Sequence, residues 1–181
     1  MGVEIRIGGY LAASFLLERE PKQWHALVLL DSGKEPTDFV QRHALSHLYL
    51  WFDDVEESRA NKQPPTRAQI EQALAFARGK DKLLVTCRAG QGRSVATAYL
   101  ICCQERGVAE AIELLDPTRH RPNRLMVALG DALMDLPDVM DQFDEWRRRH
   151  AHIQLSDYYD QLEKEYEALQ SRGTSNRICD F

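Results

Sequence analysis

The chain has 181 residues and a formal net charge of −5, and 44% of its residues are hydrophobic. This composition suits one folded domain, excludes a largely disordered chain, and disfavours a nucleic-acid-binding protein, which usually carries a basic surface. No apolar run is long enough to cross a membrane, and the N-terminus does not have the pattern of a signal peptide. The four cysteines lack disulfide or zinc spacing. We therefore expect a cytoplasmic protein.

The first part of the chain alternates strand-like and helix-like segments. Short apolar or alternating runs predict strands at 3–7, 25–30 and 47–52, and residues 10–17 are compatible with a helix. The polar segment 55–65, which ends in two prolines, interrupts regular structure. It is long enough to form a mobile lid.

A helix, a strand and a second helix follow this segment. Thr66 and Gln69 have the spacing of a capping box, which predicts that a helix begins at Thr66, and Gly79 is a plausible end for it. The apolar run 82–86 predicts a strand. The apolar residues from Ser94 onward predict a buried helix, so a strand and a helix flank a short glycine-containing loop.

The second half of the chain is predicted to be helical, with helices at 108–115, from Asn123 to about Leu133, at 137–150 and at 156–171. Asn123 is expected to cap the second of these helices, and the alternative is a supporting role near a binding pocket. Strands interleaved with helices, followed by a helical region, indicate an α/β fold with a central, mostly parallel sheet flanked by helices. We expect one domain, made of a core at 1–136 and a helical C-terminal extension at 137–181 that packs on it.

The loop between the last predicted strand and its helix has the sequence Cys87-Arg88-Ala89-Gly90-Gln91-Gly92-Arg93-Ser94. A helix N-terminus carries unpaired backbone N–H groups and a partial positive charge, and glycines let successive amides point into one concavity. Arg93 can hold two phosphate oxygens, and Cys87 lies in the resulting positive field, which favours its thiolate. The loop therefore predicts a phosphate site with a cysteine nucleophile.

This Cys-x5-Arg-Ser loop between a strand and a helix resembles that of the protein tyrosine phosphatase superfamily, in particular its dual-specificity branch. The resemblance covers roughly residues 3–133. It implies that Cys87 forms a phosphocysteine intermediate, that Arg93 binds the phosphate and that Ser94 helps the thiolate to leave. It implies no metal and no other cofactor, and it assigns phosphate binding to Arg88, Ala89, Gly90, Gln91, Gly92 and Arg93.

A phosphatase of this kind also needs an acid that protonates the leaving oxygen. The resemblance places it on a loop after an earlier strand, where the sequence has Asp53 and Asp54. Consecutive side chains point in different directions, so only one of the two should reach the pocket. Asp54 is the preferred acid by resemblance, because in similar sequences the second of two adjacent aspartates has this role, and Asp53 is the alternative.

One residue departs from the family pattern. The family usually has a histidine directly before the cysteine, where this chain has Thr86. That histidine helps to set the state of the thiolate. The substitution therefore bears on the rate of the reaction more than on its type.

We expect an enzyme that hydrolyses phosphomonoesters, most naturally on phosphotyrosine or dual-specificity protein substrates. The alternative substrate is a phosphoinositide or another small phosphate ester. The alternative function is a weakly active module that binds phosphorylated partners, which is compatible with Thr86 in place of the usual histidine. A rhodanese-like sulfur transferase also uses a loop cysteine, but the trailing Gly-x-Gly-Arg-Ser and the upstream aspartates fit it poorly. The sequence indicates no oligomeric state.

Overall fold

The structure is a computed structural model that describes residues 2–155, 168 and 177–179. Its strands are β1 (Glu4–Gly9), β2 (His25–Leu30), β3 (Ser46–Trp51) and β4 (Lys82–Cys87). The helices bounded in this part of the chain are α1 (Tyr10–Arg19), α2 (Phe39–His43), α3 (Arg67–Ala77), α4 (Arg93–Arg106), α5 (Val108–Glu113), α6 (Arg124–Asp131) and α7 (Val139–Arg149). The helix expected at 156–171 lies, apart from Ala168, outside the described residues.

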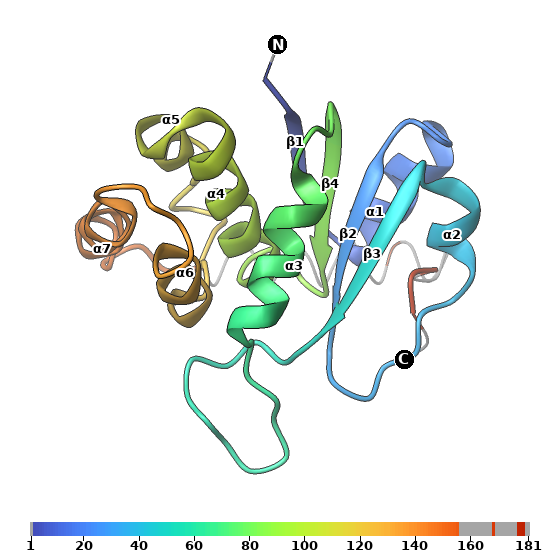
Figure 1. Ribbon diagram of the computed structural model, residues 1–181. Coiled ribbons are helices and arrows are strands. Elements are labelled where there is room, and N and C mark those ends of the chain that lie inside the picture. The colour runs from blue at the N-terminus through green and yellow to red at the C-terminus, as the bar shows by residue number, and fades with distance from the viewer. Residues whose placement is uncertain (1, 156–167, 169–176, 180–181) are drawn as a thin grey trace.

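The four strands form one sheet in the order β1-β4-β2-β3, and every neighbouring pair is parallel. This confirms the predicted α/β fold with a central parallel sheet. Because all strands run the same way, the residues that follow them meet at one edge of the sheet. Figure 1 shows this edge at the bottom of the view, where the loop between β3 and α3 extends away from the domain.

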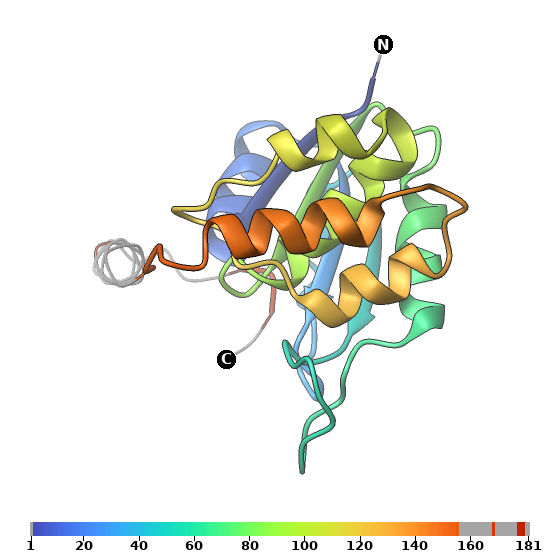
Figure 2. The same ribbon diagram turned by 90° about the vertical axis from the view of Figure 1, so that its left-hand side faces the viewer.

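Helices cover both faces of the sheet, with α3 to α7 on one face and α1 and α2 on the other (Figures 1 and 2). Successive residues of a strand point to opposite faces, so one buried strand can supply both layers. Leu27 and Leu29 of β2 pack in the core beneath α3, α4, α6 and α7, whereas Ala26, Val28 and Leu30 pack beneath α1 and α2. This explains why β2 is apolar throughout rather than alternating.

Helix α4 is the centre of the larger layer. Every residue from Arg93 to Cys103 is buried, and the helix contacts β1, β4, α3, α5 and α6. Cys102 and Cys103 lie on this helix and are both buried. Burial raises the pKa of both thiols, to about 12 for Cys103, so both stay protonated at neutral pH.

The local signals for helix ends agree with the structure. Thr66 and Gln69 form the complete capping box at the start of α3, and Gly79 lies two residues beyond its end with a φ of +70°. The side chain of Asn123 caps α6 by accepting a hydrogen bond from the Met126 N–H. The prediction missed α2, a five-residue helix whose sequence is too short to show a helical period.

The C-terminal part of the described chain packs on the core in two places. Helix α7 buries Val139, Phe143 and Trp146, and Tyr99 of α4 donates a hydrogen bond to the Val139 carbonyl at 2.8 Å. Farther along, Ile178 and Cys179 are buried in the α1 and α2 layer. The division into a core at 1–136 and an extension at 137–181 remains a prediction.

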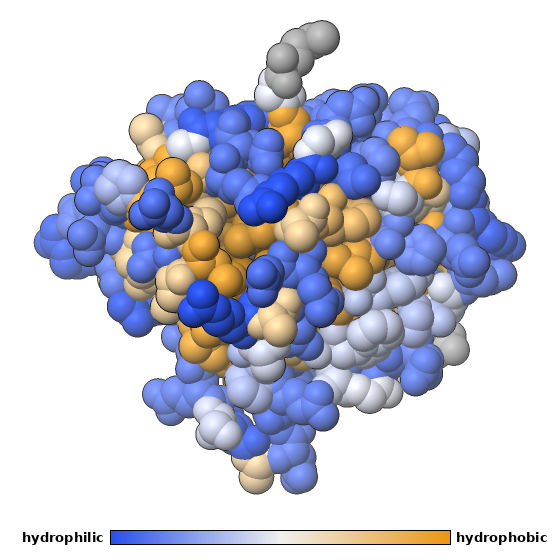
Figure 3. Space-filling view, viewed as in Figure 1, coloured by the Kyte–Doolittle hydropathy of each residue, from blue (hydrophilic) through white to orange (hydrophobic). Residues whose placement is uncertain are grey.

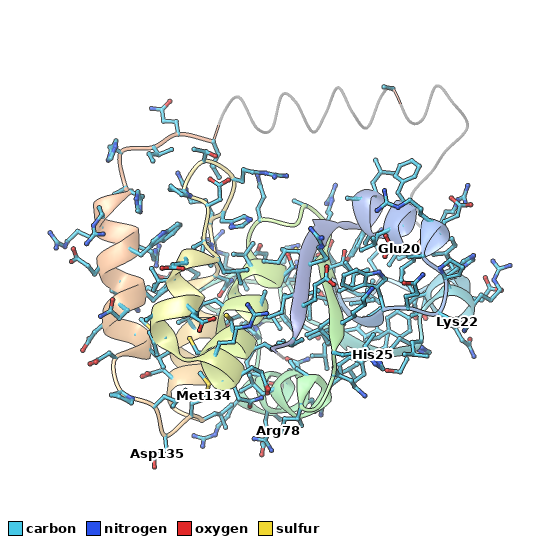
Figure 4. All side chains as sticks on the ribbon, turned by 90° about the horizontal axis from the view of Figure 1, so that it is seen from above. Glu20, Lys22, His25, Arg78, Met134 and Asp135 are labelled. Carbon is cyan, nitrogen blue, oxygen red and sulfur yellow. The ribbon has the colours of Figure 1, made fainter. Side chains whose placement is uncertain are left out.

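The face shown in Figure 3 is mainly hydrophilic, with hydrophobic side chains exposed between polar ones around α3. Figure 4 looks at the end of the sheet where the strands begin, with His25 of β2 on one side and Arg78, Met134 and Asp135 between α3 and α7 on the other. Among the described residues, no helix is both long and apolar enough to cross a bilayer.

Candidate active site

The loop from Cys87 to Gly92 joins the end of β4 directly to α4 at the carboxyl edge of the sheet. Gly92 is the N-cap of α4 and has no side chain that could accept from the first amides of the helix, and the first turn of α4 contains no acidic residue. The helix therefore lacks the side-chain cap that helix N-termini usually have. Together with the positive end of the helix dipole, its free amides make the loop a candidate site for an anion.

Gly90 lets the loop lie against the end of β1. It has a φ of +72°, and a Cβ at this position would lie 2.6 Å from the carbonyl carbon of Gly8 and even closer to the Gly9 nitrogen. Only glycine combines this conformation with such close backbone contact. The contact fixes the shape of the loop from outside.

Cys87 and Ser94 lie at the two ends of the loop. Both are buried, and the Cys87 Sγ and Ser94 Oγ atoms are 3.1 Å apart, within hydrogen-bond distance when sulfur is involved. The Ser94 hydroxyl can therefore donate to the sulfur. The structure brings these two predicted residues together.

Arg93, the first residue of α4, is 3% exposed and is held by the two connections that leave β2 and β3. One Nη atom lies 2.6 Å from Oδ1 of Asp31, and the other donates to the Phe52 carbonyl at 2.7 Å. Burial acts to lower the pKa of Arg93, but the nearby Cys87 and Asp31 outweigh burial and raise the pKa above its usual value. The guanidinium is therefore charged. Its Nε has no hydrogen-bond partner among the described residues.

Asp54 lies over the loop. A Cβ placed on Gly92 would collide with the Asp54 carboxylate, so the carboxylate lies directly against Gly92. Nδ2 of Asn123 donates to Oδ1 of Asp54 at 2.8 Å and contacts the Val55 carbonyl at 3.3 Å. The same side chain therefore caps α6 and holds Asp54 in place.

Asp53 has a different environment. It is 3% exposed, and its Oδ2 accepts hydrogen bonds from the Ser32 hydroxyl at 2.5 Å and the Gln63 N–H at 2.8 Å. Burial acts to raise the pKa of Asp53, but these hydrogen bonds and the nearby Lys62 ammonium outweigh it and hold the pKa below its usual value. A carboxylate of lowered pKa that closes the base of a loop is poorly suited to donate a proton.

The remaining predicted loop residues divide by burial. Arg88 is exposed and Ala89 is partly exposed, whereas Gln91 is 3% exposed and is enclosed by the protein. Neither polar atom of the Gln91 side chain has a hydrogen-bond partner among the described residues. Thr86 points away from Cys87, as consecutive strand residues do, and donates to the Gly8 carbonyl at 2.9 Å.

Sequence reasoning did not identify Asp31 and Ser32 as site residues. The sequence Asp31-Ser-Gly33 after an apolar strand has the composition of an ordinary turn. The only signal that could have found them is topological. In a parallel sheet, polar residues directly after a buried strand lie at the same edge as the loop after β4.

Comparison of the fold with solved structures identifies its class. PTPMT1 in complex with PI(5)P aligns over 81% of this chain and 94% of its own, with a TM-score of 0.50 and 14% identity. A mouse protein assigned as a dual specificity phosphatase and complexed with zinc tungstate aligns over 76% and 86%, with a TM-score of 0.51 and 19% identity. No protein-family model and no curated protein matches the sequence. The chain thus has the fold of the cysteine-dependent tyrosine and dual-specificity phosphatases.

Replacing Gly90 by alanine should destabilise the protein more than the same change at Gly79. The two glycines have φ values of +72° and +70°, so both alanines carry a similar backbone strain of about 1 kcal/mol. Gly79 has open space around it, whereas Gly90 abuts the backbone of β1, which should add about 2 kcal/mol. Urea denaturation measures both costs, and equal costs would contradict the contact between the loop and β1.

Replacing Asp53 by asparagine should lower the free energy of unfolding by about 1–2 kcal/mol at pH 7. Because the folded-state pKa is below the usual value of about 3.9, the stabilisation is fully present above that value and disappears as pH falls through the folded pKa. The difference from wild type should therefore shrink as the pH is lowered from about 5 to 3. Denaturant titrations across this range check it, with Asp38→Asn, an exposed acid, as the control. A difference that does not change with pH would show that ionised Asp53 is not the stabilising species.

Proposed function

We propose that this chain hydrolyses phosphomonoesters through a phosphocysteine intermediate. The observation that carries the proposal is the state of Arg93. Its two Nη atoms are held by Asp31 and the Phe52 carbonyl, while its Nε is buried without a described partner near the uncapped end of α4. A buried donor without a partner is costly, and a phosphate oxygen would satisfy it.

In the first step the Cys87 thiolate attacks the phosphorus of the bound ester. A P–S bond forms as the bond between phosphorus and the leaving oxygen breaks, and Asp54 gives its proton to that oxygen. Arg93 and the amides of the loop stabilise the charge on the transferring phosphoryl group. The position of Asp54 against Gly92 supports its role as the acid.

In the second step a water molecule attacks the phosphocysteine. The water gives a proton to the Asp54 carboxylate, the P–S bond breaks, and inorganic phosphate and the Cys87 thiolate are released. The Ser94 hydroxyl, 3.1 Å from the sulfur, can donate to the leaving thiolate. The two steps restore the enzyme and need no redox partner.

The proposed substrates are phosphorylated proteins, with phosphotyrosine first and phosphoserine and phosphothreonine beside it. One of the similar folds was solved with PI(5)P, so a phosphoinositide is the second candidate substrate. A panel of phosphopeptides and phosphoinositides compared by kcat/KM decides between them. The better class is the one that the wild type turns over faster and that the Cys87→Ser variant retains.

The wild type should hydrolyse an aryl phosphate in the presence of a metal chelator, and Cys87→Ser should lower kcat by more than about 10⁴-fold, because serine at this position is a far weaker nucleophile. Steady-state release of the phenol measures both. Cys102→Ala, which changes a buried thiol in the middle of α4, is the matched control and should keep the activity. Normal turnover by Cys87→Ser would disprove the proposal, whereas retention of labelled phosphate on the wild-type cysteine after acid quenching would support it.

Asp54→Ala should lower kcat about 10²-fold or more for esters with basic leaving groups and much less for good leaving groups, since the acid matters most when the leaving oxygen is basic.

Asn123→Ser keeps a residue that caps α6 but removes the donor to Asp54, so it should show the same trend at about tenfold with nearly unchanged stability.

A series of phenyl phosphates with different leaving-group pKa values measures this trend. Glu57→Ala, on the exposed part of the same loop, is the control and should behave as the wild type. If Asp53→Ala rather than Asp54→Ala steepens the dependence on leaving group, the acid is Asp53.

A further inference from the structure

The connection that leaves β2 touches two different parts of the candidate site through consecutive residues. Asp31 and Ser32 open a tight turn in which the Lys34 N–H donates to the Asp31 carbonyl at 3.1 Å and Gly33 has a φ of +77°. The turn lies at the carboxyl edge of the sheet, beside the connections from β3 and β4. Its two polar side chains therefore extend from one rigid piece of backbone.

The first of these side chains holds the arginine of the phosphate loop. Asp31 Oδ1 lies 2.6 Å from an Nη atom of Arg93, and after Cys87 it is the group that does most to raise the pKa of this arginine. The guanidinium is planar, so fixing both Nη atoms, one by Asp31 and one by the Phe52 carbonyl, also fixes the direction of Nε. The direction of Nε is the direction in which a phosphate would be bound.

The second side chain holds the base of the loop that carries the acid. The Ser32 hydroxyl donates to Asp53 Oδ2 at 2.5 Å, and Asp53 also closes the loop through its N–H to the Gln63 carbonyl at 2.7 Å. Asp54 is the next residue. A change in the position of Asp53 is therefore passed to Asp54 through a single peptide unit.

We propose that Asp31 and Ser32 form a positioning pair that sets the phosphate-binding arginine and the acid-bearing loop relative to each other. Neither residue touches the reacting atoms, and both act through a neighbour, Asp31 through Arg93 and Ser32 through Asp53. This inference rests on the proposed phosphatase function. It adds that one turn governs both phosphate affinity and proton donation, and that the two effects can be separated by mutation.

The two residues should have different kinetic signatures. Asp31→Asn keeps the shape of the side chain but removes its charge, so KM and the inhibition constant of inorganic phosphate should both rise about tenfold, with little change in the dependence on leaving group. Ser32→Ala releases Asp53, so kcat for basic leaving groups should fall about tenfold while the inhibition constant of phosphate stays within about twofold of wild type.

Each variant has a matched control and a rescue. Asp38→Asn and Ser58→Ala make the same chemical changes at exposed positions, one in the same connection and one on the acid-bearing loop. Asp31→Glu keeps the carboxylate and should recover most of the phosphate affinity, although it fits less well than asparagine. A purely structural role predicts the reverse order, because asparagine matches the size of aspartate and glutamate does not.

The outcomes separate this inference from the function on which it rests. If the wild type does not hydrolyse phosphate esters, the proposed function fails and no comparison of the variants is needed. If the wild type is active but Asp31→Asn and Ser32→Ala match their controls, or lower all constants together in step with a fall in melting temperature, the positioning pair is wrong while the phosphatase proposal stands. A change in phosphate inhibition alone for Asp31→Asn and a change in leaving-group dependence alone for Ser32→Ala, at melting temperatures near that of wild type, support it.

Discussion

A guanidinium that is 3% exposed has lost nearly all of its water, so the fold has to supply its partners. For Arg93 these are the Asp31 carboxylate and the Phe52 carbonyl, which come from the connections after β2 and β3. Because Arg93 is also the first residue of α4, the ion pair fixes the start of this helix against the edge of the sheet. The loop from Cys87 joins the end of β4 to this fixed start of α4, so the shape of the loop depends on the ion pair between Arg93 and Asp31. The same arrangement leaves the Nε donor of Arg93 without a partner among the described residues.

The neighbouring acids Asp53 and Asp54 show how position alone gives one residue type two roles. Asp53 points into the protein, where hydrogen bonds from Ser32 and Gln63 hold its pKa low and tie the loop to the sheet. Asp54 points the other way and lies against Gly92. The loop after β3 thus has a fixed base at Asp53 and an exposed outer part, so Asp54, the proposed acid, stays beside Gly92 while the rest of the segment lies in solvent.

The parts of the site that the sequence predicts are those in which neighbours in the chain are neighbours in space. The strand, the glycine loop and the helix around Cys87 are continuous, so composition and spacing suffice. Asp31 and Ser32 contact residues far away in the sequence, and nothing local distinguishes them from turn residues. The order of the strands is only partly local, because the apolar runs of β2 and β4 are typical of central strands but do not indicate which edge strand lies beside each of them. Asn123 was predicted to cap a helix, whereas its hydrogen bond to Asp54 depends on how the loop after β3 folds.

The contact at the C-terminal end has a consequence for the order in which the protein folds during synthesis. Cys179 forms an antiparallel backbone bridge with Pro36, and the Thr37 N–H donates to the Ile178 carbonyl at 2.9 Å, so residues 178–179 complete the layer that contains α1 and α2. Among the described residues, the layer around α4 contains none beyond Trp146. A chain that emerges from the ribosome N-terminus first can therefore close the α4 layer before the other. The connection that carries Asp31 also carries Pro36 and Thr37, so the contact between Asp31 and Arg93 should reach its final form only after residues 178–179 have been added.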